Sequence, residues 1–273
     1  MVDTHCHLYE AGDIEAELAR FKAAGGGALV CAGAGIESSK RAIELAGKYP
    51  EVWATVGVHP ESLTPEFSNL QLSITNELLN LIKNEKVVAV GECGLDYAEG
   101  MQDTPPRSPS GHLGGEDGNR GENRDRQKEL FRINVEAARE TGLPLVVHCR
   151  NAFEDIWERV KNAGVVGQMH CWTGNEEWMK KFVEAGWYIS FGGILTFKNS
   201  RDLREVAGKV PEDKLLVETD APYLAPEPVR GSKNTPANVK YVVACLAEIR
   251  GLSIQSMSKI TSENTRRLFE RMT

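Results

Sequence analysis

The chain has 273 residues, with 41% hydrophobic and 26% charged residues and a formal net charge of −7. This composition is typical of a soluble globular protein, and the acidic balance argues against broad binding to duplex nucleic acid, in which Lys and Arg must neutralise phosphates. No apolar run approaches the roughly 18–20 residues that cross a membrane, no secretory signal is visible, and six dispersed cysteines without a CxxC pair predict reduced thiols in a cytoplasmic protein.

Eight short segments rich in β-branched residues recur along the chain. They are apolar on both faces, as expected for parallel strands that are covered on both sides. The expected strands are VDTHCHL at 2–8, ALVCAG at 28–33, VWATVGVHP at 52–60, VVAVGECGLD at 87–96, PLVVHCR at 144–150, VVGQMHCW at 165–172, WYISFGG at 187–193 and LLVETDAPYL at 215–224.

The intervening stretches carry apolar residues at helical spacing, and several end in glycine, as helices often do. The expected helices are 14–25, 37–50, 76–85, 127–142, 153–164 and 176–186, with two more in the tail at 237–251 and 262–272. Strands that alternate with helices predict an α/β fold, a single (β/α)₈ TIM-type barrel over residues 1–273 with extra C-terminal helices. An open doubly wound sheet is the alternative, weakened because no Gly-rich phosphate fingerprint follows the first strand.

One segment, residues 99–125, interrupts this alternation. It contains Pro, Gly, Ser and charged residues with almost no apolar content. Its composition predicts a mobile or disordered insertion, and its length leaves a functional lid as the alternative. Because it follows the fourth strand, we expect it at the carboxyl-terminal mouth of the barrel.

Histidines and carboxylates collect at the carboxyl ends of the expected strands. His5 and His7 point to the same side of the first strand, with Cys6 on the other. Glu92 ends the fourth strand and Asp220 the eighth. In a barrel these ends meet in one pocket, where active sites lie. Five of the six histidines are at such ends, namely His5, His7, His59, His148 and His170.

Four histidines and two carboxylates are too many ligands for a single catalytic zinc, which keeps about three protein ligands. The set predicts two divalent ions, which together activate water and polarise a phosphoryl or carbonyl oxygen. Glu92 is placed to bridge the ions, and Asp220 to bind one of them and accept the proton of the attacking water. Mixed imidazole and carboxylate ligands suit Zn, Mn or Co, and Mg less well.

The motifs DTHCHL, GVHP, GECGLDY, HCR, HCWTG and ETDAPYLAP occur in the order and at the spacing of a known family. From residue 2 to about 270 the chain resembles the TatD-related metal-dependent hydrolases, a branch of the amidohydrolase-like barrels. The resemblance implies a deoxyribonuclease-like enzyme with two divalent metals, often acting from a 3′ end. It also implies that His5, His7, Glu92 and Asp220 hold one ion, and Glu92, His148 and His170 the other. The insertion at 99–125 departs from the family pattern.

Three cations near these ligands are candidates for binding phosphate. Arg150 lies two residues past His148, so it should point to the same side and could hold a phosphate by a bidentate fork, or else form a salt bridge within the mouth. Arg230 and Lys233 lie in the loop after the eighth strand, where barrels often bind phosphate. Alternatively, Arg230 and Lys233 are solvent-exposed surface charges that bind no phosphate.

Several further residues receive supporting roles. We expect His59 to hydrogen-bond substrate or a neighbouring ligand rather than bind metal. Trp172 and Tyr223 could stack on a base, with rim packing as the alternative. Glu218 should face the same interior as Asp220 and orient a ligand. Four cysteines each follow a proposed ligand and should point away from the metals, into the layer between barrel and helices: Cys6, Cys93, Cys149 and Cys171.

Together these features predict a two-metal-dependent hydrolase that cleaves DNA phosphodiester bonds, as a 3′-5′ exodeoxyribonuclease on single strands or frayed ends. No membrane and no obligate protein partner are expected. One alternative is a metal-dependent amide or ester hydrolase of a small-molecule or aminoacyl substrate. Another is a non-catalytic binding module on a dead barrel, which has no need for a complete ligand set.

Overall fold

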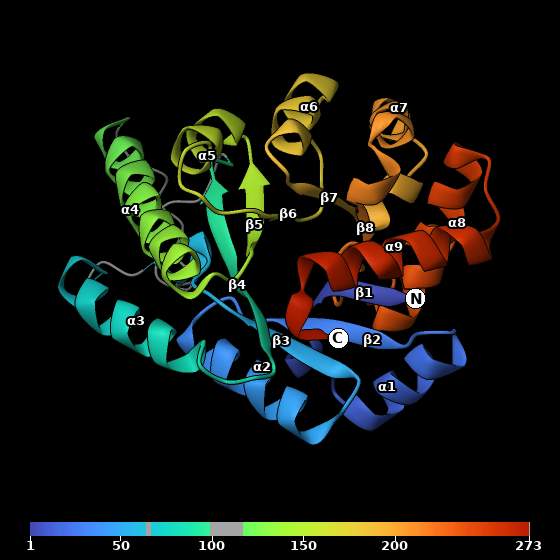
Figure 1. Cartoon of the computed structure of the whole chain (residues 1–273), viewed down its shortest axis with the longest axis horizontal. Coiled ribbons are helices and arrows are strands. Elements are labelled where there is room, and N and C mark those ends of the chain that lie inside the picture. The colour runs from blue at the N-terminus through green and yellow to red at the C-terminus, as the bar shows by residue number, and fades with distance from the viewer. Residues whose placement is uncertain (64–66, 99–116, 273) are drawn as a thin grey trace, which may run out of the picture.

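The computed structural model describes residues 1–63, 67–98 and 117–272. Eight parallel strands form one sheet in the order β1 to β8, with helices packed around its outside (Figure 1). This arrangement confirms the predicted (β/α)₈ barrel. The strands are β1 (Val2–Cys6), β2 (Ala28–Ala32), β3 (Val52–Val56), β4 (Val87–Asp96), β5 (Leu145–Arg150), β6 (Gly167–Met169), β7 (Tyr188–Phe191) and β8 (Leu215–Val217).

The barrel closes where the segment after β8 pairs with the end of β1. Cys6 and Ala221 form a parallel bridge. On either side of it, Asp220 N donates to His5 O at 2.9 Å and His7 N donates to Ala221 O at 2.7 Å. The backbone that closes the barrel is therefore the same backbone that carries three of the expected metal ligands.

Successive strand residues point into two separate apolar layers. Leu29 and Cys31 of β2 belong to the outer layer, between strands and helices. Val30 between them belongs to an inner cluster that also contains Val88, Val146, Tyr188 and Leu216. These residues come from strands on all sides of the barrel, so the inner cluster fills its interior. The alternation is the period-2 pattern of a strand.

The C-terminal part of the chain closes the amino end of the barrel. Helix α9 (Ile254–Leu268) packs against β8 and β1 (Figure 1). Leu268 and Phe269 enter the inner cluster, and Phe269 is fully buried. The Arg271 guanidinium donates to the carbonyls of Ile82, Asn84 and Val87 at 3.2, 3.2 and 2.7 Å. The amino end is thus filled by side chains, which leaves the carboxyl end for a site.

Helices alternate with the strands as predicted, and their bounds show where the sequence analysis fell short. Helix α7 lies between β7 and β8 and was not predicted; its buried Leu203, Val206 and Ala207 supply the apolar face. Helix α9 begins eight residues before the predicted 262–272, since the Ser253 side chain caps it by accepting from Ser256 N. The remaining helices are α1 (Ile14–Ala23), α2 (Ile36–Lys48), α3 (Phe67–Leu81), α4 (Asp117–Thr141), α5 (Phe153–Val160), α6 (Glu176–Glu184), α7 (Arg201–Lys209) and α8 (Val239–Arg250).

Part of the expected insertion is helical. Residues 117–125 form the first turns of α4. Side-chain pairs one turn apart support them, with Arg126 donating to Glu122 and Gln127 to Asn123, both at 2.8 Å. The remainder of that prediction, residues 99–116, lies outside the described residues.

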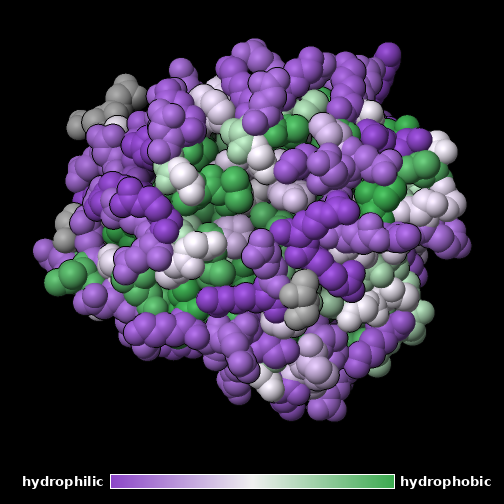
Figure 2. All heavy atoms as spheres, in the orientation of Figure 1, coloured by the Kyte–Doolittle hydropathy of each residue, from purple (hydrophilic) through white to green (hydrophobic). Residues whose placement is uncertain are grey.

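The surface is dominated by polar groups. Hydrophilic residues cover most of the face in Figure 2, with apolar residues visible in patches between them. Over residues 1–63, 67–98 and 117–272, no helix combines the length and apolar character that crossing a membrane requires.

Gly94 couples β4 to the neighbouring strand that carries His148, and this close approach can be tested. Gly94 has φ +143°, and a Cβ at this position would lie 2.0 Å from the His148 carbonyl oxygen. Gly94→Ala should therefore lower the free energy of unfolding by more than about 2 kcal/mol, because both backbone strain and overlap oppose it. Urea denaturation measures this change.

The matched control is Gly251→Ala, at the end of α8. Gly251 has φ +63°, and a Cβ there would meet nothing within 4 Å. Only the left-handed backbone opposes this substitution, which should lower stability by about 1 kcal/mol. Equal losses for the two variants would show that the contact with β5 does not constrain Gly94.

Candidate metal centre

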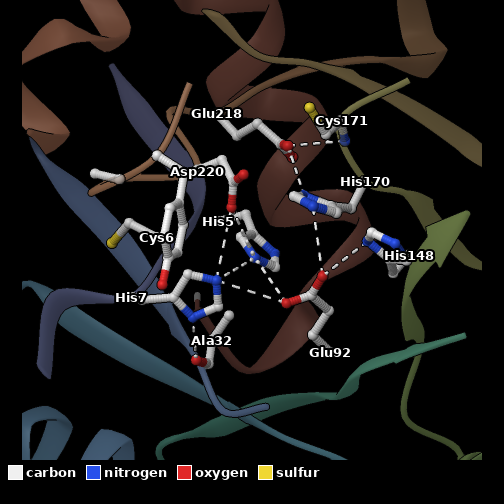
Figure 3. Close-up of polar contacts among 12 residues, drawn as sticks. His5, Cys6, His7, Ala32, Glu92, His148, His170, Cys171, Glu218 and Asp220 are labelled. Carbon is white, nitrogen blue, oxygen red and sulfur yellow. Dashed lines mark hydrogen bonds and ion pairs between the residues drawn. The ribbon is translucent and has the colours of Figure 1, made fainter. Parts of the chain in front are cut away.

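Six histidine and carboxylate side chains from five strands meet at the carboxyl end of the barrel. Figure 3 shows them pointing toward a common centre. His5 and His148 lie on β1 and β5, and Glu92 lies on β4; the other three lie one to three residues beyond the end of their strand. The six predicted ligands that the fold brings together are His5, His7, Glu92, His148, His170 and Asp220.

Four of these side chains leave room for one cation. His5 Nε2 lies 3.4 Å from His7 Nε2 and 3.4 Å from Glu92 Oε2. His7 Nε2 lies 3.6 Å from Glu92 Oε2, and Asp220 Oδ1 lies 3.6 Å from both imidazole nitrogens. Four ligands at about 2.1 Å from a tetrahedral cation are separated by about 3.4 Å. His5, His7 and Asp220 therefore have the mutual spacing of ligands to one divalent ion, and Glu92 Oε2 lies at a similar distance from both imidazole nitrogens.

The second oxygen of Glu92 faces a different group of imidazoles. Glu92 Oε1 lies 3.3 Å from His148 Nδ1 and 3.5 Å from both His170 Nε2 and His59 Nε2. One carboxylate thus has one oxygen in each of two ligand clusters. That is the arrangement in which a carboxylate can bind two ions at once.

The outer nitrogens of His7 and His148 show which inner nitrogens have a free lone pair. His7 Nδ1 lies 2.9 Å from the Tyr9 hydroxyl, which can donate or accept a hydrogen bond, and 3.1 Å from the Ala32 carbonyl oxygen, which can only accept one. His148 Nε2 lies 3.1 Å from Asp96 Oδ2. Each proton therefore belongs on the outer nitrogen, which leaves His7 Nε2 and His148 Nδ1 available to a metal.

His170 contacts Glu218 as a close ion pair without the geometry of a hydrogen bond. Its Nδ1 lies 2.6 Å from Glu218 Oε1, and its Nε2 faces Glu92. The Glu218 side chain is fully buried and is itself fixed by the Cys171 amide at 2.8 Å and the Ser190 hydroxyl at 2.5 Å. This contact agrees with the expectation that Glu218 orients a ligand.

His59 has the opposite arrangement of protons. Its Nδ1 accepts a hydrogen bond from the Glu61 amide at 3.2 Å, so in the neutral ring the proton is on Nε2, which faces Glu92 Oε1. Burial lowers the pKa of His59 to about 4, which favours the neutral ring. His59 Nε2 therefore faces Glu92 Oε1 at 3.5 Å. His59, Glu92 and His148 also lie close enough together to hold a metal ion, so the supporting role of His59 stays a prediction.

Both carboxylates of the cluster are held in the charged form. Burial alone would raise the pKa of Glu92, but nearby His59, His5 and His170 hold it well below its usual value. Burial likewise opposes ionisation of Asp220, and its hydrogen bond with His7 lowers its pKa. Buried carboxylates that stay ionised beside imidazole lone pairs form a donor set suited to divalent cations.

Five of the six predicted ligands, all except His5, line a cavity of about 740 Å³. Of the residues expected to contact substrate, His59, Arg150 and Tyr223 line it. The Arg150 side chain is 64% exposed, and its NH1 lies 4.0 Å from Asp96 Oδ2, so a loose ion pair is present. Tyr223 is 51% exposed, so its ring is accessible at the mouth.

Trp172 is placed for packing, the alternative given above, and not for stacking on a base. Trp172 is only 2% exposed and does not line the cavity. Its ring packs at 5.0 Å from Phe153 and 6.1 Å from Phe182, in the layer outside the barrel. Because β6 ends at Met169 and Cys171 has φ +44°, the strand alternation that would place Trp172 on the same side as His170 does not continue this far.

Arg230 and Lys233 are exposed but do not line the cavity. The Arg230 guanidinium lies 4.1 Å from the ring centroid of Phe197. Lys233 Nζ donates to the main-chain oxygen of Glu10 at 3.1 Å. The loop after β8 thus directs both cations to other partners, and the structure gives no contact that supports phosphate binding by either residue.

The cysteines divide into two pairs. Cys6 and Cys93 are buried in the outer apolar layer, as expected. Cys149 also packs against the outer apolar layer, as expected, and both Cys149 and Cys171 border the cavity. Cys171 has φ +44°, so the alternation of a strand does not continue through it.

The sequence analysis assigned no role to Asp96, although its carboxylate contacts a predicted ligand. Asp96 is 4% exposed, and its own amide and carbonyl are paired with the side chain of Gln127 at 2.9 and 3.0 Å. A signal was present in the sequence, because Asp96 lies four residues after Glu92 on one strand, and residues at even spacing share a face.

Comparisons with known proteins agree with this geometry. The TatD related DNase family model matches residues 2–270. Over 98% of both chains, the protein is 37% identical to the uncharacterized metal-dependent hydrolase YabD of Bacillus subtilis. It is 31% identical to a Salmonella typhimurium protein named 3'-5' ssDNA/RNA exonuclease TatD, over 95% of this chain and 94% of that one.

The fold is also shared with a solved structure. The crystal structure of YjjV, a TatD homologue from Escherichia coli, superposes with a TM-score of 0.83 at 26% identity, over 99% of this chain and 98% of that chain. Family model, relatives and fold all extend over nearly the whole chain. The protein therefore belongs to the TatD-related DNase family of metal-dependent hydrolases.

Proposed function

We propose that the protein is a 3′-5′ exodeoxyribonuclease that uses two divalent ions to hydrolyse single strands or frayed ends. The observation that carries the proposal is the position of Glu92, whose two oxygens lie in two separate histidine clusters. The name of the Salmonella relative supports the choice of a nucleic-acid substrate and a 3′ end. The cavity above the clusters is open to solvent at the barrel mouth, where a strand end can enter.

Each ion would be held by its own imidazoles, and Glu92 would be shared. His5, His7 and Asp220 would complete one site, and His148 and His170 the other. When bound, two such ions activate water and stabilise the charge that develops on a phosphoryl group. Zn, Mn and Co suit this ligand set, and Mg suits it less well.

The protein groups around the ions supply orientation and proton transfer. Asp220 is ionised and faces the cavity, so it can accept the proton of the attacking water. The neutral His59, whose Nε2 lies 3.5 Å from Glu92 Oε1, would help to keep that carboxylate in place. Arg150 is the side chain we propose for the substrate phosphate, because its guanidinium is exposed at the cavity.

One observation favours hydrolysis of a small ester or amide as a second candidate function. Among the residues that the structure describes, Arg150 is the only Lys or Arg that lines the cavity. A protein that binds a long polynucleotide normally contacts its phosphates with several Lys or Arg side chains. A single phosphate or carboxylate group needs no more than one.

Glu92→Gln tests the shared ligand. The amide keeps the size of the side chain but cannot supply a charged oxygen to each ion. We expect hydrolysis of a labelled oligonucleotide to fall by at least about 100-fold, with bound metal reduced below two ions per chain. Metal analysis and rate measurements on the same sample check this, and an unchanged melting temperature shows that the barrel remains folded. Two tightly bound ions and near-normal activity in this variant would contradict the shared-ligand assignment.

Asp96→Asn tests whether Asp96, through His148, strengthens metal binding at the site that contains His148. Losing the charged acceptor at His148 Nε2 should weaken binding of one ion by about 10–100-fold and leave the other unchanged. Calorimetric titration with Mn²⁺ resolves the two events. Asp155→Asn is the matched control, since Asp155 pairs with Lys128 at 3.1 Å and contacts no proposed ligand. Equal effects of the two substitutions would count against a role of Asp96 through His148.

Arg150→Gln tests whether Arg150 binds the phosphates of a strand. For a nuclease, the Michaelis constant for an oligonucleotide should rise, and the slope of its logarithm against log salt should fall by about 0.7, the value for one phosphate on a single strand. Arg230→Gln, which alters a cation outside the cavity, should change neither. A small neutral ester such as p-nitrophenyl acetate should be hydrolysed equally by both variants. If the oligonucleotide constants also stay unchanged, Arg150 does not bind the strand.

A further inference from the structure

The charged side chains at the mouth of the cavity are distributed unequally. Glu10 follows β1, Glu61 follows β3 and Arg150 ends β5, and all three line the cavity. In a barrel of eight strands in sequential order, β1 and β5 are four strands apart and therefore lie on opposite sides. The mouth thus has Arg150 on one side and Glu10 on the opposite side, with Glu61, which follows β3, about a quarter of the barrel from each. We call Glu10 and Glu61, which both lie close enough to Tyr223 to affect its pKa, the acidic wall.

The acidic wall consists of hydrogen-bond acceptors close to the ligand cluster. The Tyr223 hydroxyl donates to Glu10, at 3.2 Å from one carboxylate oxygen and 3.1 Å from the other. Burial raises the pKa of Tyr223 to about 12, with further contributions from Glu10, Asp220 and Glu61. The side chain of Glu61 is 69% exposed, and one of its oxygens lies 4.0 Å from His59 Nδ1. A group placed here meets negative charge and acceptors.

One cation adjoins this wall without entering the cavity. Lys233 Nζ is bonded to the main-chain oxygen of Glu10, and Lys233 does not line the cavity. Arg150 is on the far side, where its nearest acidic partner is Asp96 at 4.0 Å. A phosphate of the strand can therefore be paired on the β5 side, whereas a phosphate on the opposite side would face Glu10 and Glu61.

We propose that the acidic wall selects the chemistry of the strand end: Glu10 and Glu61 accept hydrogen bonds from a terminal hydroxyl and repel a terminal phosphate. This inference rests on the proposed nuclease function and specifies its substrate further. A terminal hydroxyl is a donor that the carboxylates can pair, whereas a terminal phosphate brings up to two negative charges against them. Like charges at such a contact disfavour binding, and solvent screening reduces the effect because the Glu61 side chain is 69% exposed.

The selected end is regenerated by the reaction. Water adds to the last internucleotide phosphorus, and the bond from that phosphorus to the 3′ oxygen of the penultimate nucleotide breaks. The 3′ oxygen takes up a proton, and the released product is a nucleoside 5′-phosphate. The shortened strand carries a new 3′ hydroxyl, so the acidic wall accepts each successive end.

The test compares two oligonucleotides that differ only in a 3′ hydroxyl or a 3′ phosphate, each labelled at the 5′ end. With the metal-reconstituted full chain, the hydroxyl end should be hydrolysed at least roughly tenfold faster. In the double variant E10Q/E61Q, the ratio should fall at least roughly threefold because the phosphate end is cut faster. The matched control is E37Q/E177Q, whose glutamates are 85% and 72% exposed on α2 and α6 and change the net charge equally. The control should keep the wild-type ratio.

The outcomes separate this inference from the function on which it rests. A ratio near one in the wild-type protein, or an unchanged ratio in E10Q/E61Q, overturns the selection by the acidic wall while hydrolysis itself stands. A ratio that falls equally in E37Q/E177Q assigns the effect to net charge and also overturns it. If the wild-type protein cuts neither oligonucleotide, the nuclease function fails and the inference fails with it. The single variants Glu10→Gln and Glu61→Gln, with melting temperatures, show that any change in ratio does not come from unfolding.

Discussion

The site depends on one carboxylate placed between two groups of imidazoles. Glu92 is 4% exposed, yet nearby histidines keep it ionised, with Oε2 among His5 and His7 and Oε1 facing His148 and His170. A buried charge of this kind is unfavourable unless it is paired. Cations between the clusters would satisfy its charge together with the lone pairs of the imidazoles. The remaining contacts of the site position these groups.

The fold positions three of the histidines through contacts to the ring nitrogens that point away from Glu92. The outer nitrogens of three histidines face acceptors supplied by other strands: the Ala32 carbonyl, Asp96 and Glu218. Those contacts set both the ring orientation and the nitrogen that carries the proton. The tail that ends in α9 fills the opposite end of the barrel, so stability and chemistry are assigned to different ends.

Much of this arrangement follows from the sequence, because strand periodicity and barrel topology are regular. Alternation placed His5 and His7 together with Cys6 opposite, and the barrel brought distant strand ends into one pocket. The predictions failed where the backbone leaves that regularity. Cys171 has a left-handed φ just after β6, so the alternation stops there and the buried Trp172 does not line the cavity. No spacing rule predicts the partners of loop residues such as Arg230, and the pairing of Asp96 with His148 joins residues 52 positions apart.

The central claim is that Glu92 is shared between two cations, and anomalous scattering from a crystal of the protein grown with Mn²⁺ tests it most directly. The account predicts two peaks about 3.5–4 Å apart, one beside each Glu92 oxygen. The first should be within bonding distance of His5, His7 and Asp220, and the second of His148 and His170. A single fully occupied peak, or two peaks of which only one contacts Glu92, would contradict it.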